Sequence, residues 1–241
     1  MTAQEPDAAA RTTHDAVAAL LWGGSTQQGR RGPKPKLTVE QIADTGIAIA
    51  DEEGLDAVTM HRVADRLGAT KMALYRYVPG RAELDAVMLD RALGRPGEPQ
   101  DGDWRRALAQ WATELYTRAS ARRWTVELVQ RPHLPGPSEL AWFEAGLSVM
   151  EHLELDGGER LDTLALLVGH VLSIVRQEAG GPNPEDDMAA ALAPVLAARA
   201  QEYPLTTAAF AESGARARNR ALAFGIERVI AGVESLVSER R

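Results

Sequence analysis

The fold of this chain is decided by the stretch Thr59-Met-His-Arg-Val-Ala-Asp-Arg-Leu-Gly-Ala-Thr-Lys-Met-Ala-Leu-Tyr-Arg-Tyr-Val78. Its pattern predicts two short helices joined by a tight turn at Gly68. In and just beyond it a single acid, Asp65, stands against five cations: Arg62, Arg66, Lys71, Arg76 and Arg81. A helix–turn–helix presents its second helix to the DNA major groove, which is wide enough to admit a helix. The stretch therefore predicts a contact with DNA.

The flanking residues complete a small helical domain. Thr38-x-x-Gln41 is a capping-box pattern, and apolar residues recur at helical spacing from there to about Glu53. Thr59 is expected to cap the second helix and Thr70 the third. Pro79-Gly80 ends the third helix, and a fourth helix follows over about 81–93.

Helix breakers divide the rest of the chain. Gly94-Arg-Pro-Gly-Glu-Pro-Gln-Asp-Gly-Asp103 is the clearest boundary. We therefore predict an all-α protein with a flexible N-terminal extension and basic arm (1–36), a helix–turn–helix domain (37–93), a linker (94–103) and a larger helical domain (104–241). Within the extension, Asp15–Trp22 can form one or two helical turns that dock through Leu21 and Trp22. In the larger domain we expect helices over about 104–121, 123–130, 138–155, 158–179, 186–201 and 209–238.

The distribution of charge suits a protein with one DNA-binding face. The net charge is −7, but residues 30–36 hold four cations and no acid. Residues 96–241 hold 15 cations and 21 acids, a net charge of −6. Phosphate binding needs a local basic face and not a basic protein. The acidic total therefore does not exclude a DNA-binding protein.

The composition also indicates the cellular compartment in which this protein is expected. With no cysteine there is no disulfide and no thiolate metal site, which fits a reducing compartment. No apolar run approaches the roughly 20 residues that span a bilayer, and the N-terminus lacks the order of a signal peptide. We expect a soluble, cytoplasmic protein with no membrane association.

Side chains at the start of the second helix of a helix–turn–helix reach base edges. Lys71 can donate to guanine, and Met72 can pack on a thymine methyl group. His61 is expected to lie near the groove, although it can equally be an ordinary surface histidine. The expected phosphate contacts are Thr59, Tyr75, Tyr77 and Arg81, although Tyr75 can instead belong to the core.

Cations outside this turn have weaker assignments. Arg30 and Arg31 of the basic arm can enter the adjacent minor groove, or simply add salt-dependent affinity. Arg62 and Arg66 lie on a helix face where charges are usually only solvated. A role in DNA binding and a purely solvated role both stay open for these two residues.

Four motifs resemble the N-terminal domain of the TetR family of transcriptional regulators: Glu53-Gly-Leu-Asp-x-Val-Thr-Met60, Val63-Ala-Asp-Arg-Leu-Gly68, Ala73-Leu-Tyr-Arg-Tyr-Val78 and Arg81-x-Glu-Leu84. The resemblance covers about residues 37–93. The last 140 residues are similar in length and helix count to the C-terminal class of the tetracycline repressor. The resemblance implies a homodimer, usually a repressor, which a small molecule releases from double-stranded operator DNA. Positions that match DNA contacts in the family are Thr59, His61, Lys71, Met72, Ala73, Tyr75, Arg76, Tyr77 and Arg81. The family often has Lys at position 81 and His at position 77, so this chain departs from it there.

Specific reading of DNA calls for a dimer, because one recognition helix covers too few base pairs. Two such helices read half-sites roughly 34–36 Å apart. Apolar stripes on two long predicted helices are the best dimer surface, and packed with their symmetry mates they would form a four-helix bundle. The alternative is that the stripes face the monomer core. The stripes contain Leu161, Leu164, Val168, Leu172, Leu222, Ile226, Val229 and Val233.

An effector pocket needs a cavity lined by large side chains and a few polar groups. The candidates are Trp111, Tyr116, Trp124, His133, Trp142, Met150, His170 and Arg176. Core packing is the alternative for each of them. The histidines lack the paired spacing of a metal site, so we expect no metal and no cofactor.

Two other functions compete with an effector-released repressor. The first is an activator, or a DNA-binding protein without an effector, which a sealed core in the larger domain would favour. The second is an enzyme, but no nucleophile elbow, metal triad or phosphate loop accompanies the acids and histidines. In the favoured mechanism the ligand shifts the fourth helix (81–93) and so changes the separation of the two recognition helices.

Overall fold

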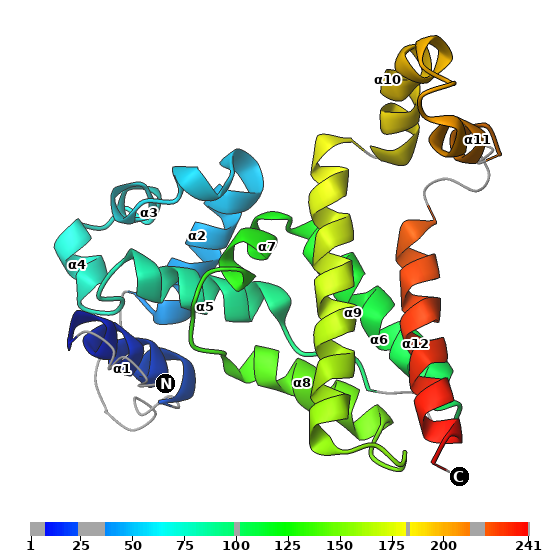
Figure 1. The fold of residues 1–241 in the computed structure, drawn as a ribbon. Coiled ribbons are helices and arrows are strands. Elements are labelled where there is room, and N and C mark those ends of the chain that lie inside the picture. The colour runs from blue at the N-terminus through cyan, green and yellow to red at the C-terminus, as the bar shows by residue number, and fades with distance from the viewer. Residues whose placement is uncertain (1–7, 24–36, 99–101, 182–183, 213–219, 241) are drawn as a thin grey trace. The chain divides into compact units, whose positions relative to one another are not determined.

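The computed structural model describes residues 8–23, 37–98, 102–181, 184–212 and 220–240 (Figure 1). Every regular element within these ranges is helical, which confirms the all-α class. The chain forms two compact units. The first contains Met1–Gly97 and Ala121–Glu144, and the second contains Glu98–Ser120 and Ala145–Arg241.

The first unit contains the helix–turn–helix and the helices that support it. Its elements are α1 (Ala8–Trp22), α2 (Val39–Glu53), the 3-10 helix η1 (Leu55–Ala57), α3 (Met60–Arg66), α4 (Lys71–Tyr75), α5 (Arg81–Leu93) and α7 (Trp124–Val129). The predicted capping box is confirmed, because Gln41 N donates to Thr38 Oγ1 and Thr38 N donates to Gln41 Oε1. Helix α2 ends at Gly54, whose φ of 88° suits glycine.

One apolar core joins these elements. Ile42 and Ile49 of α2, Val63 of α3 and Leu74 of α4 are fully buried. Trp124 of α7 lies in the same core, together with Leu128. The core therefore recruits α7, a helix more than thirty residues away from α5 along the chain.

The presence of α7 in this core differs from the predicted domain boundary. Residues 121–144 belong to the compact unit of the helix–turn–helix, whereas the sequence assigned all of 104–241 to the larger domain. The reason is that Trp124 is both buried and hydrogen-bonded, with its indole Nε1 2.7 Å from Asp51 Oδ1 of α2. The functional boundary at 94–103 stays a prediction.

The second unit contains the long helices. Its elements are α6 (Trp104–Ala121), α9 (Gly157–Gln177), the 3-10 helix η2 (Glu178–Gly180), α10 (Pro184–Ala198), α11 (Pro204–Glu212) and α12 (Ala221–Ser238), and α8 (Pro137–Val149) runs into it from the first unit. Leu108 of α6 and Leu164, Leu167 and Val171 of α9 are fully buried. Asp156 and Glu159 form a capping box at the start of α9.

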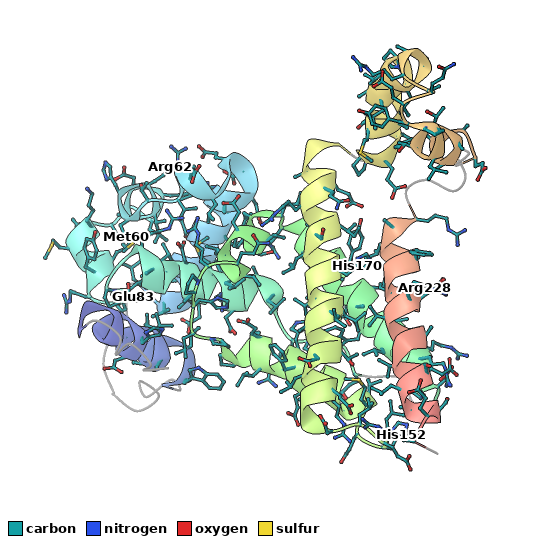
Figure 2. All side chains as sticks on the ribbon, in the orientation of Figure 1. Met60, Arg62, Glu83, His152, His170 and Arg228 are labelled. Carbon is teal, nitrogen blue, oxygen red and sulfur yellow. The ribbon has the colours of Figure 1, made fainter. Side chains whose placement is uncertain are left out.

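Helices α9 and α12 pack side by side (Figure 1). Figure 2 shows His170 of α9 between them. Its Nε2 lies 3.0 Å from the Ala221 carbonyl oxygen and 3.1 Å from that of Leu222. Because carbonyl oxygens only accept, Nε2 is the protonated nitrogen. His170 therefore fastens α9 to the first turn of α12.

Three predicted elements have different bounds. Helix α1 begins at Ala8, so it is longer than the predicted one or two turns. The helix expected over 138–155 ends at Val149, and a series of turns follows it. The helix expected over 209–238 is two helices, α11 and α12, separated by residues 213–219, which lie outside the described ranges. No helix in the described part of the chain is long and apolar enough to cross a membrane.

Candidate nucleic-acid interface

The two helices of the predicted motif are both capped by threonine. Thr59 Oγ1 accepts from Arg62 N at the start of α3, and Thr70 Oγ1 accepts from Ala73 N at the start of α4. Gly68 has a φ of 63° in the turn between them, as predicted for a left-handed residue. Two backbone bonds, Gly68 N to Asp65 O and Ala69 N to Ala64 O, close this turn. Local sequence alone thus fixes where each helix begins and ends.

Burial divides α4 into an inner and an outer face. Leu74 is fully buried, and Ala73 and Tyr77 are half-buried. Met72 is 74% exposed, Tyr75 is 42% exposed, and Lys71 and Arg76 are exposed. Among the described residues, neither Lys71 nor Arg76 has an acidic partner. The outer face of α4 thus presents two cations, a thioether and a phenol.

The two arginines of α3 are paired with acids of α2. Arg62 binds Glu53, and Arg66 donates through both terminal nitrogens to Glu52, with 2.7 Å between Nη1 and Oε2. The hydrogen bond from Arg66 holds the pKa of Glu52 below its usual value. Figure 2 shows Arg62 at the α2–α3 side of the unit. These cations pair with acids and hold two helices together, a role that differs from both the solvated and the DNA-contact interpretations.

Arg81 is also occupied within the chain. Its Nε lies 2.6 Å from Asp85 Oδ1, Nη2 lies 3.1 Å from the Leu55 carbonyl oxygen, and Nη1 binds the Val58 carbonyl oxygen. All three of its nitrogens therefore have acceptors. A phosphate contact from Arg81 would require some of these bonds to break, so the expected contact stays a prediction.

The surroundings of the remaining predicted DNA contacts differ from residue to residue. His61 is exposed, with Nδ1 3.3 Å from Asp65 Oδ1. The Thr59 hydroxyl accepts as a cap and keeps its own proton for donation. Arg30 and Arg31 lie outside the described residues, so their minor-groove contact stays a prediction.

Comparisons with known proteins agree with this geometry. A family model described as "Tetracyclin repressor-like, C-terminal domain" matches residues 95–237, and one described as "Bacterial regulatory proteins, tetR family" matches residues 42–85. This chain belongs to the TetR family. The second match covers most of α2, the helix–turn–helix and the start of α5, so the DNA-binding motif predicted at 59–78 is confirmed.

Individual relatives are similar to this TetR-family chain over most of its length. An HTH-type transcriptional repressor, DrrR1 of Streptomyces coeruleorubidus, is 32% identical over 235 residues, which cover 92% of this chain and 86% of that protein. The structure of apo ActR from Streptomyces coelicolor matches with a TM-score of 0.76 at 23% identity, over 86% of this chain and 99% of that one. ActR in complex with actinorhodin matches with a TM-score of 0.73 at 23% identity, over 85% and 99%. The two ActR structures establish the likeness in fold.

The predicted effector residues of this TetR-family chain are divided between its two units. In the second unit, Trp111 and Met150 are buried, and Arg176 is exposed. Tyr116 Oη donates to Glu178, with 2.8 Å to Oε2. His170 binds α12, as described above. Each of these side chains except Arg176 has a packing or hydrogen-bonding role within the unit.

The other three predicted effector residues belong to the first unit. Trp124 is bonded to Asp51, and Trp142 Nε1 donates to the Gly94 carbonyl oxygen over 2.9 Å. His133 contacts the Arg131 carbonyl oxygen through Nδ1 and Glu139 through Nε2. The hydrogen bond to Glu139 raises the pKa of His133. The two tryptophans thus fasten helices, and the alternative of core packing describes them better.

Two cavities lie within single units. One, of about 420 Å³ in the first unit, is lined by His133 and by residues that sequence reasoning missed, among them Asp85 and Arg131. Another, of about 280 Å³ in the second unit, has Trp104, His152 and Glu234 in its wall. Arg81 and Asp85 are four residues apart, a spacing that signals an ion pair but no cavity.

Part of the predicted dimer stripes is buried within the second unit, and the dimer interface stays a prediction. Leu164 is fully buried, and Ile226 and Val233 are nearly so, because these faces of α9 and α12 pack into their own unit. Val168, Leu172, Leu222 and Val229 are half-buried, and Leu161 is 49% exposed. The most exposed large apolar side chains on these helices are Leu166 and Phe224, at 61% and 63%. The most exposed large apolar side chains on α9 and α12 are therefore not members of the predicted stripes.

Proposed function

We propose that this protein is a homodimeric repressor that binds operator DNA through α4 and is released by a small-molecule effector. The observation that carries the proposal is the outer face of α4, where Lys71 and Arg76 are exposed and have no acidic partner in the described part of the chain, while the neighbouring arginines are paired. Exposed cations can bind phosphates and guanine without first giving up an intramolecular bond. The relative named as a repressor supports this direction of control.

Assignments within the interface follow from exposure. Lys71 and Met72 read bases from the first turn of α4, with His61 beside them. Tyr75, Arg76, Thr59 and the backbone near Ala73 hold phosphates, and Tyr77 contributes mainly through packing. Arg30 and Arg31 add affinity from the arm.

The dimer places two copies of α4 on one operator. We assign its interface to the exposed apolar face of α9 and α12, with Leu161, Leu166 and Phe224 at its surface. The half-buried Val168, Leu172, Leu222 and Val229 lie at its edge. Effector control is supported by the solved complexes of ActR with actinorhodin and with (S)-DNPA, which are ligands of that protein.

DNA binding tests the proposal directly. Footprinting of the promoter upstream of the protein's own gene is expected to show protection of two half-sites about one helical turn apart. Lys71→Ala is expected to weaken binding by about 1–3 kcal/mol and to relax specificity at one position of each half-site. Arg76→Ala is expected to weaken binding to all sequences and to lower the slope of log affinity against log salt.

Arg66→Ala is the matched control, because Arg66 is an exposed arginine of the same motif that is already paired with Glu52. It is expected to leave the salt slope unchanged. A larger effect of Arg66→Ala than of Arg76→Ala on DNA affinity would contradict the assignment. Protection that no candidate ligand relieves would favour a regulator without an effector.

A further inference from the structure

The cavity of about 420 Å³ in the first unit lies against the helix that follows the DNA-reading motif. Its walls come from α1, α5 and the chain from the end of α7 onward. Most of the lining is apolar, with Val17 of α1, Ala86 and Leu89 of α5, and Leu128 of α7. Cavities of roughly 300–1,000 Å³ with apolar walls and a few polar groups are typical of small-molecule sites.

Asp85 is the acidic group of this cavity. Its side chain is only 15% exposed, and its Oδ1 accepts from Arg81. Its Oδ2 faces Arg131 Nη1 at 3.7 Å, which is too long for a hydrogen bond. Burial raises the pKa of Asp85 even though Arg81 and Arg131 act in the opposite direction. The carboxylate is therefore incompletely compensated on its Oδ2 side.

Arg131 is held loosely beside it. Its guanidinium is 53% exposed and lies 3.7 Å from Asp85 and 3.9 Å from Glu127. Both contacts are ion pairs, and neither has the length of a hydrogen bond. His133, in contrast, has both ring nitrogens engaged and serves as a fixed wall.

We propose that this cavity binds an apolar small molecule that carries a protonated amine, with its ammonium group hydrogen-bonded to Asp85 Oδ2. The aromatic or aliphatic body fills the space between Val17, Ala86 and Leu128, and Arg131 turns toward Glu127. A buried carboxylate is stabilised by a cation with a good hydrogen bond, whereas a neutral or acidic head group leaves it uncompensated.

The position of this site connects it to DNA binding. Arg81 joins Asp85 to the carbonyl oxygens of Leu55 and Val58, directly before the Thr59 cap of α3. A ligand at Asp85 thus lies one side chain away from the helix–turn–helix. The site lies wholly within the DNA-binding unit, so it goes beyond the proposed effector response and does not depend on operator binding.

Direct binding to the full chain tests the site. Isothermal titration in the absence of DNA would compare 1-naphthylmethylamine with 1-naphthalenemethanol and 1-naphthoic acid, which share one ring system. We expect one amine molecule per chain, bound at least about tenfold tighter than the alcohol, a difference of about 1.4 kcal/mol. No binding of the amine, equal binding of the alcohol, or tighter binding of the acid would each overturn the proposal.

Two variants locate the bound amine. Asp85→Asn keeps the shape of the side chain and is expected to abolish the preference for the amine. Asp44→Asn is the matched control, because Asp44 also pairs with an arginine of α5, Arg91, and does not line the cavity. It is expected to bind the amine as the parent does.

Ala86→Phe covers the case in which Asp85→Asn fails to fold. It fills the cavity without removing a charge and is expected to weaken amine binding at least about tenfold. Thermal melting without ligand would establish that each variant is folded. Amine binding that persists in a folded Ala86→Phe variant, or a preference that survives in Asp85→Asn, would place the amine elsewhere and overturn the assignment.

Discussion

The guanidinium of Arg81 supports the backbone in front of α3, and this use competes with a phosphate contact. Arg81→Lys keeps the positive charge but loses the fork that reaches Leu55 and Val58. We expect the free energy of unfolding to fall by about 1–3 kcal/mol, because the Val58 carbonyl oxygen loses its Arg81 donor and the Leu55 carbonyl oxygen keeps only the backbone N–H of Val58. The slope of log DNA affinity against log salt is expected to stay unchanged.

Chemical denaturation and a salt titration of operator binding measure these two quantities separately. Arg76→Lys is the control for the charge-conserving change, since Arg76 has no acidic partner within the described ranges and its replacement should leave stability within about 0.5 kcal/mol. A lower salt slope in Arg81→Ala, which removes the charge, would restore Arg81 as a phosphate contact.

The contact between His170 and Gly225 leaves no room for a larger residue. A Cβ atom at position 225 would lie 2.1 Å from His170 Nε2, so the imidazole has to leave the carbonyl oxygens of α12. Gly225→Ala is therefore expected to destabilise the protein by about 1–3 kcal/mol, despite the higher helix propensity of alanine. The measurement is the free energy of unfolding in urea.

A double-mutant cycle separates the clash from other effects of this substitution. In a His170→Ala background the obstructing ring is absent, so Gly225→Ala is expected to be neutral or stabilising by up to about 1 kcal/mol. Equal destabilisation in both backgrounds would show that the glycine is needed for another reason.

At the scale of elements, α5 is fastened at both ends. Its first residue, Arg81, holds the backbone before α3. Near its last turn, Asp90 accepts from Ser138 N over 2.7 Å and from Ser138 Oγ over 3.1 Å. Asp90 thus caps the start of α8 from another helix. Gly136 permits this approach, because a Cβ there would lie 2.2 Å from Asp90 Oδ1.

Removing the cap of α8 should lower the free energy of unfolding by an amount that depends on which bonds are lost. Asp90→Ala is expected to lower the free energy of unfolding by about 0.5–2 kcal/mol, the usual cost of losing an N-cap. Ser138→Ala should cost less, since the backbone bond survives. Asp44→Ala breaks only an exposed pair with Arg91 and should cost about 1 kcal/mol or less. An Asp90→Ala variant no less stable than Asp44→Ala would argue against a capping role.

The elements that could be predicted from sequence are those with local start and stop signals. Thr38, Thr59 and Thr70 and the turn at Gly68 act through bonds between residues three to five positions apart, so their pattern is visible in a short window. The place of α7 was not predictable in this way. Trp124 reaches Asp51 across 73 positions, and an apolar tryptophan in sequence does not indicate which core it enters.

At the scale of the whole molecule, the same limit applies to the predicted sites. The apolar stripes on α9 and α12 predict a dimer surface, but Leu164 and Ile226 are buried in their own unit. A periodic stripe shows that a helix face is covered and does not show by what. The cavity at Asp85 was missed for a related reason, since residues of three separate segments create it.

The exposed face of α9 and α12 leads to a prediction about assembly. Leu166 and Phe224 are the most exposed large apolar side chains on these two helices, and exposed apolar patches on a soluble protein commonly mark contacts with other proteins. If the proposed dimer forms through this face, Leu166→Glu with Phe224→Glu is expected to convert it to a monomer in sedimentation equilibrium, because each interface would bury four added charges. Operator affinity should fall with it, since a monomer engages a single half-site. Leu140→Glu, at another exposed leucine on α8, is expected to stay dimeric. A double variant that remains a dimer would require the interface to lie on a different face of the chain.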